Sequence, residues 1–389
     1  MNLTTGGKIY IETILKEGKM NYRKLGKTDL TVSALGLGCM RFPNDKKGRL
    51  DEDYGVELIR KAIDNGVNYM DTGYPYHGGR SEVILGRALK DGYREKTIVA
   101  TKCPMGQMSS TDDFDRVLKI QFDRLDLTSI DSYMFHGLDK SSFDNKVIKF
   151  GLLDKMEQAR AEGKIKYIGF SFHDSYDAFM HILDGYSWDF AQVQMNYIDI
   201  EYQATLKGVK EAGARGVGVI AMEPLLGGKL ANLSSAAQAM MDNNKSSVEW
   251  ALDFLWNLPE MSIVLSGMSS LTQLEQNIEY ASRSEVGMLT DENIEMLMKV
   301  RDVYNGLLLA PCTRCKYCMP CPAGIDIPRA LKAFNSTATG TLEEALAYYN
   351  RQVPVGASEC LNCKRCEEDC PQHIKVSKLM KEINEIFGR

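Results

Sequence analysis

Residues 67–92, "VNYMDTGYPYHGGRSEVILGRALKDG", contain the pattern that decides the fold. The first six residues include three apolar side chains, Val67, Tyr69 and Met70, and residues 81–92 are an amphipathic run that ends in glycine. A short apolar run predicts a buried strand, and a glycine after the last apolar position is a common helix stop. The stretch therefore predicts one strand and one helix, joined by a loop of aromatic, histidine and glycine residues.

The same strand and helix pair recurs along the chain. Seven more short apolar runs predict strands, at residues 34–40, 97–102, 130–136, 165–171, 190–196, 216–222 and 262–267. Helix-like stretches lie between them, for example at residues 53–66, 151–163 and 271–283. Such alternation predicts a parallel sheet, and eight pairs over about 260 residues favour an α/β protein with a (β/α)8 TIM barrel. A doubly wound open sheet is the alternative, although no G-x-G-x-x-G follows the first strand.

The composition is that of a globular protein, with 44% hydrophobic and 25% charged residues and a net charge of −5. The mild acidity argues against a nucleic-acid or membrane-surface partner, which a basic patch would normally indicate. No apolar run reaches the roughly 18 residues of a membrane span, and no signal peptide is visible. We therefore expect a cytoplasmic protein whose thiols stay reduced.

Cysteine is concentrated near the end of the chain, where eight of the ten cysteines lie between Cys312 and Cys370. In a reducing compartment this density favours metal or cluster ligation over disulfides. The segment also contains a repeat, because "CPAGIDIPRAL" at residues 321–331 matches "CPQHIKVSKLM" at residues 370–380. Each half is therefore expected to hold a cysteine run, a Cys-Pro turn and a helix.

The second cysteine run, at residues 360–371, has the spacing C-x2-C-x2-C-x3-C-P of bacterial ferredoxins. The first run, at residues 312–322, has one residue fewer before its Cys-Pro. In two-cluster ferredoxins the Cys-Pro cysteine of each run binds the cluster of the other run. The expected ligand sets of two [4Fe–4S] clusters are Cys312, Cys315 and Cys318 with Cys370, and Cys360, Cys363 and Cys366 with Cys321. Two zinc sites or a redox dithiol are the alternatives, although zinc-binding cysteines usually occur as separated pairs.

Polar side chains collect at the expected C-terminal ends of three strands, where barrel enzymes carry their active sites. They are Asp71 and Tyr76 after the second strand, Lys102 at the third and His136 at the fourth. A lysine cation lowers the pKa of a nearby phenol from about 10, which would help Tyr76 to donate a proton. An aspartate holds the lysine in place, and a histidine can bind a carbonyl oxygen beside the phenol.

These residues resemble the aldo-keto reductase family over about residues 22–283, including the "SEVILGRAL" that follows Tyr76. The resemblance implies that Tyr76 is the general acid, that Lys102 and Asp71 tune it, and that His136 orients the carbonyl. The whole chain is similar to the iron–sulfur branch of this family, which has a C-terminal two-cluster [4Fe–4S] domain.

The resemblance also implies NAD(P)H as the cofactor, with Ser171 and Gln192 holding the nicotinamide carboxamide. The other implied contacts are Met222 at the nicotinamide ring, Gly227, Gly228 and Lys229 at the pyrophosphate, and Gly267, Gln273 and Asn277 at the adenosine end. Phe172 replaces an asparagine of many relatives. Gly267 and Gln273 stand where relatives that bind a 2′-phosphate have cations. A 2′-phosphate needs such cations, so the resemblance favours NADH or use of both cofactors.

Four segments are expected: an N-terminal extension at residues 1–19, the barrel at 20–285, a linker helix at 286–309 and a ferredoxin-like domain at 310–389. For the extension we consider both a natural and a non-native origin. The expected activity is hydride transfer between NAD(P)H and a small-molecule carbonyl or alcohol, with the clusters used for electron transfer or docking, and with a ferredoxin-type protein as a candidate partner. The alternatives are a non-catalytic nucleotide and redox sensor, and a one-electron reductase driven by ferredoxin.

Overall fold

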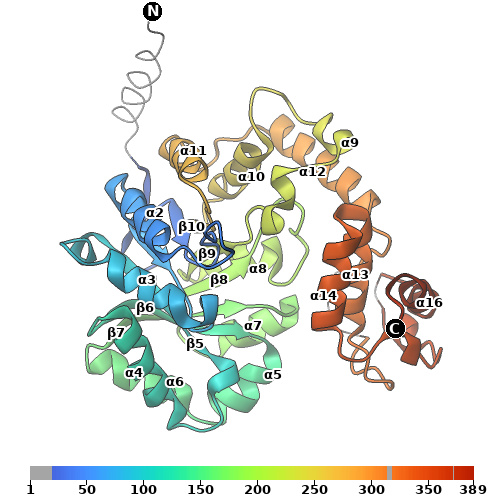
Figure 1. Ribbon diagram of the computed structural model, residues 1–389, viewed down its shortest axis with the longest axis horizontal. Coiled ribbons are helices and arrows are strands. Elements are labelled where there is room, and N and C mark those ends of the chain that lie inside the picture. Colours follow the sequence, from blue (N-terminus) through green and yellow to red (C-terminus); the bar gives the residue numbers. More distant parts are fainter. Residues whose placement is uncertain (1–19, 313–317, 371) are drawn as a thin grey trace, which may run out of the picture.

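The computed structural model describes residues 20–312, 318–370 and 372–389, so the N-terminal extension lies outside the described residues. Eight parallel strands close into a barrel in the order β10-β3-β4-β5-β6-β7-β8-β9 (Figure 1). Their bounds are β3 (Leu35–Gly38), β4 (Tyr69–Asp71), β5 (Ile98–Pro104), β6 (Ile130–Leu138), β7 (Ile165–Phe172), β8 (Phe190–Gln194), β9 (Gly218–Met222) and β10 (Met261–Ser266). The predicted TIM barrel is confirmed, and pairing of β10 with β3 excludes the open sheet.

Each barrel strand is followed by a helix on the outside of the barrel (Figure 1). These helices are α2 (Glu52–Asp64), α3 (Arg80–Ala88), α4 (Asp113–Leu125), α6 (Leu152–Ala161), α7 (Tyr176–Asp184), α8 (Thr205–Ala214), α10 (Ser247–Trp256) and α11 (Leu271–Ser282). Several begin at a capping side chain, as α2 does at Asp51, whose carboxylate accepts a hydrogen bond from the backbone of Tyr54. Just beyond α2, Gly66 has φ +88°, a conformation that favours glycine, as expected for a helix stop.

Shorter elements occupy the loops between the barrel strands. They are η1 (Tyr76–Gly79), η2 (Arg94–Lys96), η3 (Met105–Gln107), α5 (Lys140–Ser142), the π-helix η4 (Phe143–Ile148), η5 (Leu226–Ala231) and α9 (Ser235–Gln238). Of these, η1 and η5 follow the C-terminal ends of β4 and β9, so both contribute to the mouth where barrel active sites lie.

The barrel interior is packed and closed at its N-terminal end. A hairpin of β1 (Tyr22–Lys24) and β2 (Thr31–Ser33) precedes the barrel, and its Leu25 and Val32 join the apolar side chains inside it. Where β3 meets β10, a Cβ on Gly36 would come within 2.6 Å of a Leu265 methyl, so this contact needs glycine. Side chains of the hairpin therefore close the N-terminal end of the barrel, and an active site can form at the C-terminal end.

Helix α12 (Asp291–Gly306) leaves the barrel but remains packed on it. Its Leu297, Val300 and Tyr304 belong to the barrel's hydrophobic core. The Arg301 guanidinium donates to the backbone oxygen of Ile198 in the loop after β8, at 3.3 Å. The helix expected as a linker therefore also covers part of the barrel surface.

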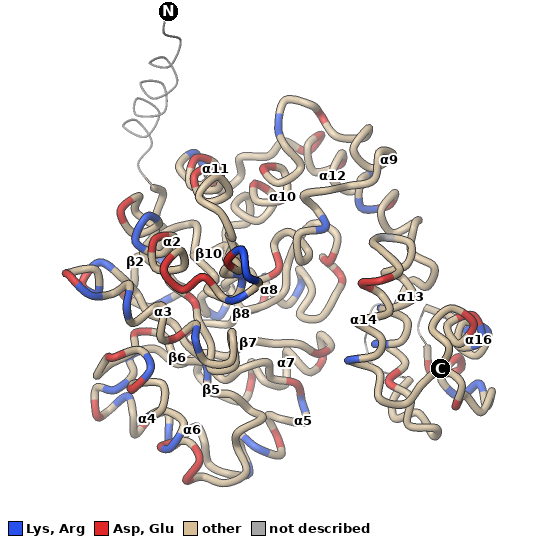
Figure 2. Tube along the Cα trace, viewed as in Figure 1, with Lys and Arg blue, Asp and Glu red and all other residues tan. Residues whose placement is uncertain are grey.

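A second, smaller core begins at Ala310 and forms a separate helical body beside the barrel (Figure 1). Its elements are α13 (Ile327–Thr339), α14 (Leu342–Gln352), η6 (Ala357–Glu359), α15 (Arg365–Glu368) and α16 (Val376–Phe387). A long helix follows each Cys-Pro cysteine of the repeat, α13 after Cys321 and α16 after Cys370, as the repeat predicted. Basic and acidic residues are interspersed over both bodies (Figure 2). Of the helices in the described ranges, none has both the length and the apolar character to span a membrane.

Candidate active site and cluster domain

The four residues predicted for catalysis lie together at the barrel mouth. Asp71 ends β4, Tyr76 begins η1, and Lys102 and His136 lie on the adjacent strands β5 and β6. The Lys102 ammonium donates to Asp71 Oδ1 at 2.5 Å and lies 4.8 Å from the centre of the Tyr76 ring. The Tyr76 and His136 rings are 5.7 Å apart and nearly perpendicular. The phenol of Tyr76 therefore has both a lysine cation and an imidazole as close neighbours.

Asp71 and Lys102 form a buried ion pair, with 3% and 1% of their surfaces exposed. Burial raises the pKa of the Asp71 carboxyl, and the charge and hydrogen bond of Lys102 oppose this. Burial also disfavours the Lys102 cation, but the charges and hydrogen bonds of Asp71 and Tyr76 outweigh it and raise the pKa of Lys102. A buried charge needs such a partner. The pair therefore keeps a cation fixed beneath the phenol.

The pKa of Tyr76 differs from the sequence prediction. We expected Lys102 to bring it below the usual value of about 10. Lys102 does lower it, but burial of the phenol is the larger effect, and the nearby Asp71 acts in the same direction as burial. The pKa of Tyr76 is therefore raised, and the prediction was wrong because the sequence does not reveal how far a side chain is desolvated.

Histidine 136 is a neutral imidazole across the physiological range. Burial lowers its pKa to about 3, and the positive charges of Lys102 and His173 act in the same direction. A neutral imidazole donates one hydrogen bond and accepts one. His136 can therefore bind a carbonyl oxygen without adding a charge of its own.

The residues predicted for the nicotinamide lie on the next strands and have groups that fit a carboxamide. Gln192 Nε2 donates to Asp71 Oδ2 at 3.3 Å, while its buried Oε1 has no hydrogen-bond partner among the described residues. A buried acceptor without a donor is uncommon, and the NH2 of a carboxamide would satisfy it. Ser171 Oγ accepts from the Gly137 amide at 2.7 Å, which leaves the hydroxyl hydrogen available to a ligand.

Phe172, the residue after Ser171, belongs to the hydrophobic core outside the barrel. Its ring lies 5.2 Å from that of Phe179 on α7 and is fully buried. Neighbouring residues of a strand point to opposite faces, so Ser171 and Phe172 cannot both face the mouth. The side chain of Phe172 is therefore used for packing.

The loop after β9 has the backbone expected of a close approach to a ligand. Gly227 and Gly228 in η5 have φ of 68° and 98°, a region that favours glycine. Met222 is the last residue of β9, and Lys229 follows the two glycines. Burial lowers the pKa of Lys229, while the carboxylates of Glu344 on α14 and Asp199 oppose this. A carboxylate on a helix of the smaller body therefore favours the charged form of Lys229 in this loop.

The predicted adenosine-end residues Gln273 and Asn277 lie on α11 and are tied to the end of β10. Gln273 Oε1 accepts from the Ser269 amide at 2.9 Å. Asn277 is buried, and its Nδ2 donates to Ser266 Oγ at 3.0 Å. Both amides therefore order the segment around Gly267.

Arg41 was missed by the sequence reasoning. This exposed residue lies in the loop after β3, and a Cβ on Gly267 would come within 2.6 Å of its Cγ. A Cβ on Gly227 would lie 4.0 Å from Arg41 Nη2. Arg41 therefore places a cation between two of the predicted nucleotide segments. The sequence signal for this residue is the basic side chain in "GLGCMRF", directly after the first predicted strand.

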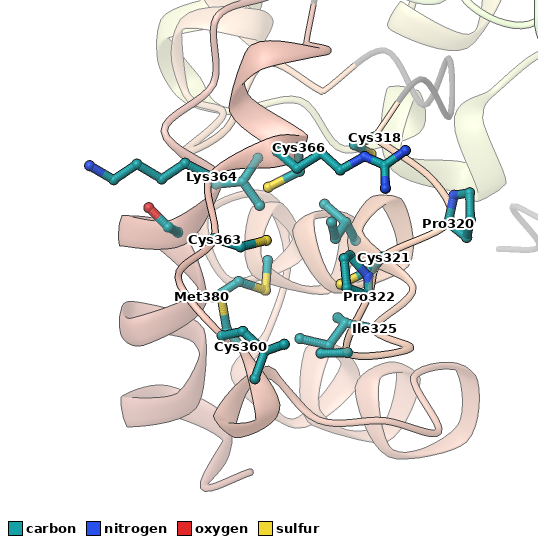
Figure 3. Close-up of a pocket in the computed structure, with 16 residues that line it drawn as sticks. Cys318, Pro320, Cys321, Pro322, Ile325, Cys360, Cys363, Lys364, Cys366 and Met380 are labelled. Carbon is teal, nitrogen blue, oxygen red and sulfur yellow. The ribbon is translucent and has the colours of Figure 1, made fainter.

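The second cysteine run lines a pocket in the smaller body (Figure 3). Cys360, Cys363 and Cys366 line it together with Cys321, which is the ligand set predicted for one cluster, and with Cys318. The apolar part of the lining is formed by Ala323, Ile325, Ile327, Leu361, Val376 and Met380. Thiols around a mostly apolar hollow have the chemistry that an iron–sulfur cluster requires.

The cysteine side chains line one space but do not converge on a single point. In the part of the chain that the structure describes, no three histidine, cysteine or carboxylate side chains are arranged to hold a single metal ion. A [4Fe–4S] cube instead has four irons that each take one thiolate. Of the other predicted set, Cys312 and Cys370 lie in the described residues and Cys318 lines the pocket above, while Cys315 lies outside the described residues.

Two family models match the chain. Residues 34–302 match the aldo/keto reductase family, and residues 311–375 match the 4Fe-4S dicluster domain. The first match covers the barrel and α12, and the second covers the cysteine runs and the helices between them.

Individual relatives agree with the first match. L-galactose dehydrogenase of Arabidopsis thaliana is 32% identical over 293 residues, covering 69% of this chain and 90% of the plant protein. The uncharacterized oxidoreductase YqkF of Bacillus subtilis is 26% identical and covers 73% of this chain and 98% of its own length. The holo form of aldo-keto reductase AKR11C1 from Bacillus halodurans superposes with a TM-score of 0.62 over 72% of this chain and 96% of its own, at 24% identity. The chain therefore belongs to the aldo/keto reductase family of NAD(P)H-dependent oxidoreductases and carries a 4Fe–4S dicluster domain after its barrel.

Proposed function

We propose that the barrel interconverts a small-molecule carbonyl and its alcohol by hydride transfer with NAD(P)H, using Tyr76 as the general acid and base. The observation that carries this proposal is the buried ion pair of Asp71 and Lys102 next to the Tyr76 ring, with the His136 ring also beside the phenol. A cation held there stabilises the phenolate that forms when Tyr76 gives up its proton.

When bound, reduced nicotinamide would supply a hydride to the carbonyl carbon. The Tyr76 hydroxyl donates its proton to the carbonyl oxygen. Hydride on the carbon and a proton on the oxygen together convert the carbonyl to the alcohol. The neutral His136 ring donates a hydrogen bond to that oxygen and fixes its position. Lys102 remains charged and compensates the negative charge left on Tyr76, and Asp71 holds Lys102 in place.

For the nucleotide, Ser171 and Gln192 are proposed to bind the carboxamide, with Met222 beside the ring. The phosphate contacts are assigned to Gly227, Gly228, Lys229 and Arg41, and the adenosine end to Gly267, Gln273 and Asn277. Gly267 and Gln273 provide no cation for a 2′-phosphate, so NADH or use of both cofactors remains favoured.

For the smaller domain we propose two [4Fe–4S] clusters with the crossed ligand sets given above. We retain residues 20–285 as the barrel, 286–309 as the connecting helix and 310–389 as the cluster domain, in a cytoplasmic protein. The clusters serve electron transfer or docking of a partner such as a ferredoxin. A hydride carries two electrons and a cluster passes one at a time, so a converter such as a flavin would be needed between them.

This mismatch gives a testable result for the clusters. Dithionite or a low-potential ferredoxin should reduce them, whereas NADH alone, without flavin or substrate, should not. The measurement is anaerobic electron paramagnetic resonance after mixing. A strong reduced-cluster signal from NADH in flavin-free protein would mean that electrons pass directly from hydride to cluster, contrary to the proposal.

The pH dependence of the barrel reaction follows from the raised pKa of Tyr76 and the lowered pKa of His136. Reduction needs the protonated phenol, so its rate should be flat between about pH 6 and 9, where Tyr76 is protonated and His136 is neutral. Alcohol oxidation needs the phenolate, whose fraction rises about tenfold per pH unit below the pKa. Oxidation should therefore climb steadily through pH 9.

Both directions can be measured after an anaerobic screen of aldehydes, ketones and alcohols with NADH and NADPH. A bell-shaped reduction profile with an apparent pKa near about 6.5 would contradict the neutral state assigned to His136. If nicotinamide binds but no carbonyl or alcohol turns over, a sensing role for the barrel is favoured over the proposed reaction.

A further inference from the structure

A buried polar network lies behind the catalytic residues. Its centre is Glu82 on α3, whose side chain is fully buried. Glu82 Oε1 accepts hydrogen bonds from Thr101 Oγ1 at 2.8 Å and from Gln121 Nε2 at 2.7 Å. Its Oε2 accepts from Arg124 Nη1 at 3.0 Å. Both carboxylate oxygens of Glu82 therefore accept hydrogen bonds, and the donors of the two oxygens lead to different parts of the site.

One direction leads to the turn that carries Tyr76. Arg124 Nη1 also donates to the backbone oxygen of Tyr74 at 3.0 Å, and the guanidinium lies 4.3 Å from the centre of the Tyr74 ring. At the end of the same turn, Gly79 has φ +91°, and a Cβ there would come within 2.6 Å of Arg124 Cζ. Arg124 thus contacts the turn on both sides of the catalytic tyrosine.

The other direction leads to the strand that carries Lys102. Gln121 Nε2 donates to the Lys102 backbone oxygen at 3.1 Å, and Thr101 is the residue just before Lys102. The orientation of Gln121 is fixed by the Tyr133 hydroxyl, which donates to Gln121 Oε1 at 2.7 Å. Glu82 therefore joins the backbone on one side of the site to the backbone on the other.

We propose that Glu82 and Arg124 are positioning residues that set the spacing between the phenol of Tyr76 and the ammonium of Lys102. Neither touches the reacting atoms, and the inference rests on the proposed roles of Tyr76 and Lys102. A buried carboxylate is costly unless all its hydrogen bonds are satisfied, and apolar packing would stabilise a helix contact at lower cost. Here every contact of the carboxylate leads to one of the two catalytic segments.

The test replaces Arg124 by glutamine in the full chain, with Arg116→Gln as the control. Arg116 lies on the same helix and forms an exposed ion pair with Asp113, away from the network. A misplacement of about 1 Å can cost about 10²-fold in rate. Arg124→Gln should therefore lower kcat for carbonyl reduction by about 10- to 100-fold and leave the Kd of NADH within about two-fold. The control should match wild type.

Arg124→Lys covers the case in which Arg124→Gln does not fold. A lysine keeps the charge beside Glu82 but lacks the planar fork of arginine, so its kcat should lie between those of wild type and Arg124→Gln. The readout that a purely structural role would not move is the pH profile of alcohol oxidation. It should shift to higher pH in both Arg124 variants, since Lys102 is then less well placed to stabilise the phenolate.

Two results overturn the inference. One is a kcat for Arg124→Gln, or for Arg124→Lys where only that variant folds, that equals that of Arg116→Gln. The other is a loss of kcat with an unchanged pH profile. Retention of activity by Tyr76→Phe would instead contradict the assignment of Tyr76 itself, so the two failures are distinguishable.

Discussion

Replacing Tyr76 with phenylalanine should abolish carbonyl reduction while NADH binding stays nearly intact. The substitution removes only the hydroxyl, and with it the proton donor to the carbonyl oxygen. Loss of a positioned general acid costs about 10²- to 10⁴-fold in rate. The expected result is measured as kcat/KM for the best carbonyl of the screen, with the Kd of NADH measured in the same preparation.

Among the described residues, neither the imidazole nor the ammonium beside Tyr76 can replace it as the proton donor. His136 is neutral and half-buried, and its pKa of about 3 makes its imidazolium unavailable at neutral pH. Lys102 is held by Asp71 at 2.5 Å and by the backbone oxygen of Thr72 at 2.6 Å. Tyr93→Phe is a matched control, because the Tyr93 hydroxyl contacts the surface residue Asp64. If Tyr76→Phe stays within a few-fold of wild type, the assignment of the general acid is wrong.

The fold was predictable because each structural element repeats one local pattern. Apolar runs such as residues 165–171 and amphipathic runs such as 53–66 have lengths and endings that distinguish strands from helices. Their strict alternation leaves few topologies. The proximity of Asp71, Tyr76, Lys102 and His136 was predictable for the same reason, since adjacent parallel strands of a barrel end at one rim.

What could not be predicted depends on burial and on contacts between distant segments. The raised pKa of Tyr76 follows from how completely packing excludes water from the phenol, which no local pattern encodes. Arg41 lies close to Gly227 and Gly267 because β3, β10 and β9 are neighbours in the barrel, although Arg41 is 186 residues before Gly227 in the sequence. The carboxylate of Glu82 belongs to a family-like motif, but its partner Arg124 is one of three basic residues on α4, and no local pattern distinguishes it from the other two.

Removing Cys321 should cost one of the two clusters and leave the other. Cys321 belongs to the first cysteine run, yet it lines the pocket of Cys360, Cys363 and Cys366. The wild-type chain should hold about eight irons, and Cys321→Ala about four, when it is purified without oxygen. Iron and sulfide are measured per chain, and stoichiometric zinc with little iron would show that the cysteines bind zinc ions instead.

A double variant decides whether the ligation is crossed. With crossed ligation, Cys321→Ala and Cys363→Ala damage the same cluster, so the double variant should keep about four irons, as each single variant does. With uncrossed ligation they damage different clusters, and almost no iron should remain. For the double variant Cys370→Ala with Cys363→Ala the expectation is reversed. Almost no iron should remain with crossed ligation, and about four irons should remain with uncrossed ligation. The pocket favours the crossed case, since Cys321 of the first run, with Cys318 beside it, lines the same pocket as the three thiols of the second run.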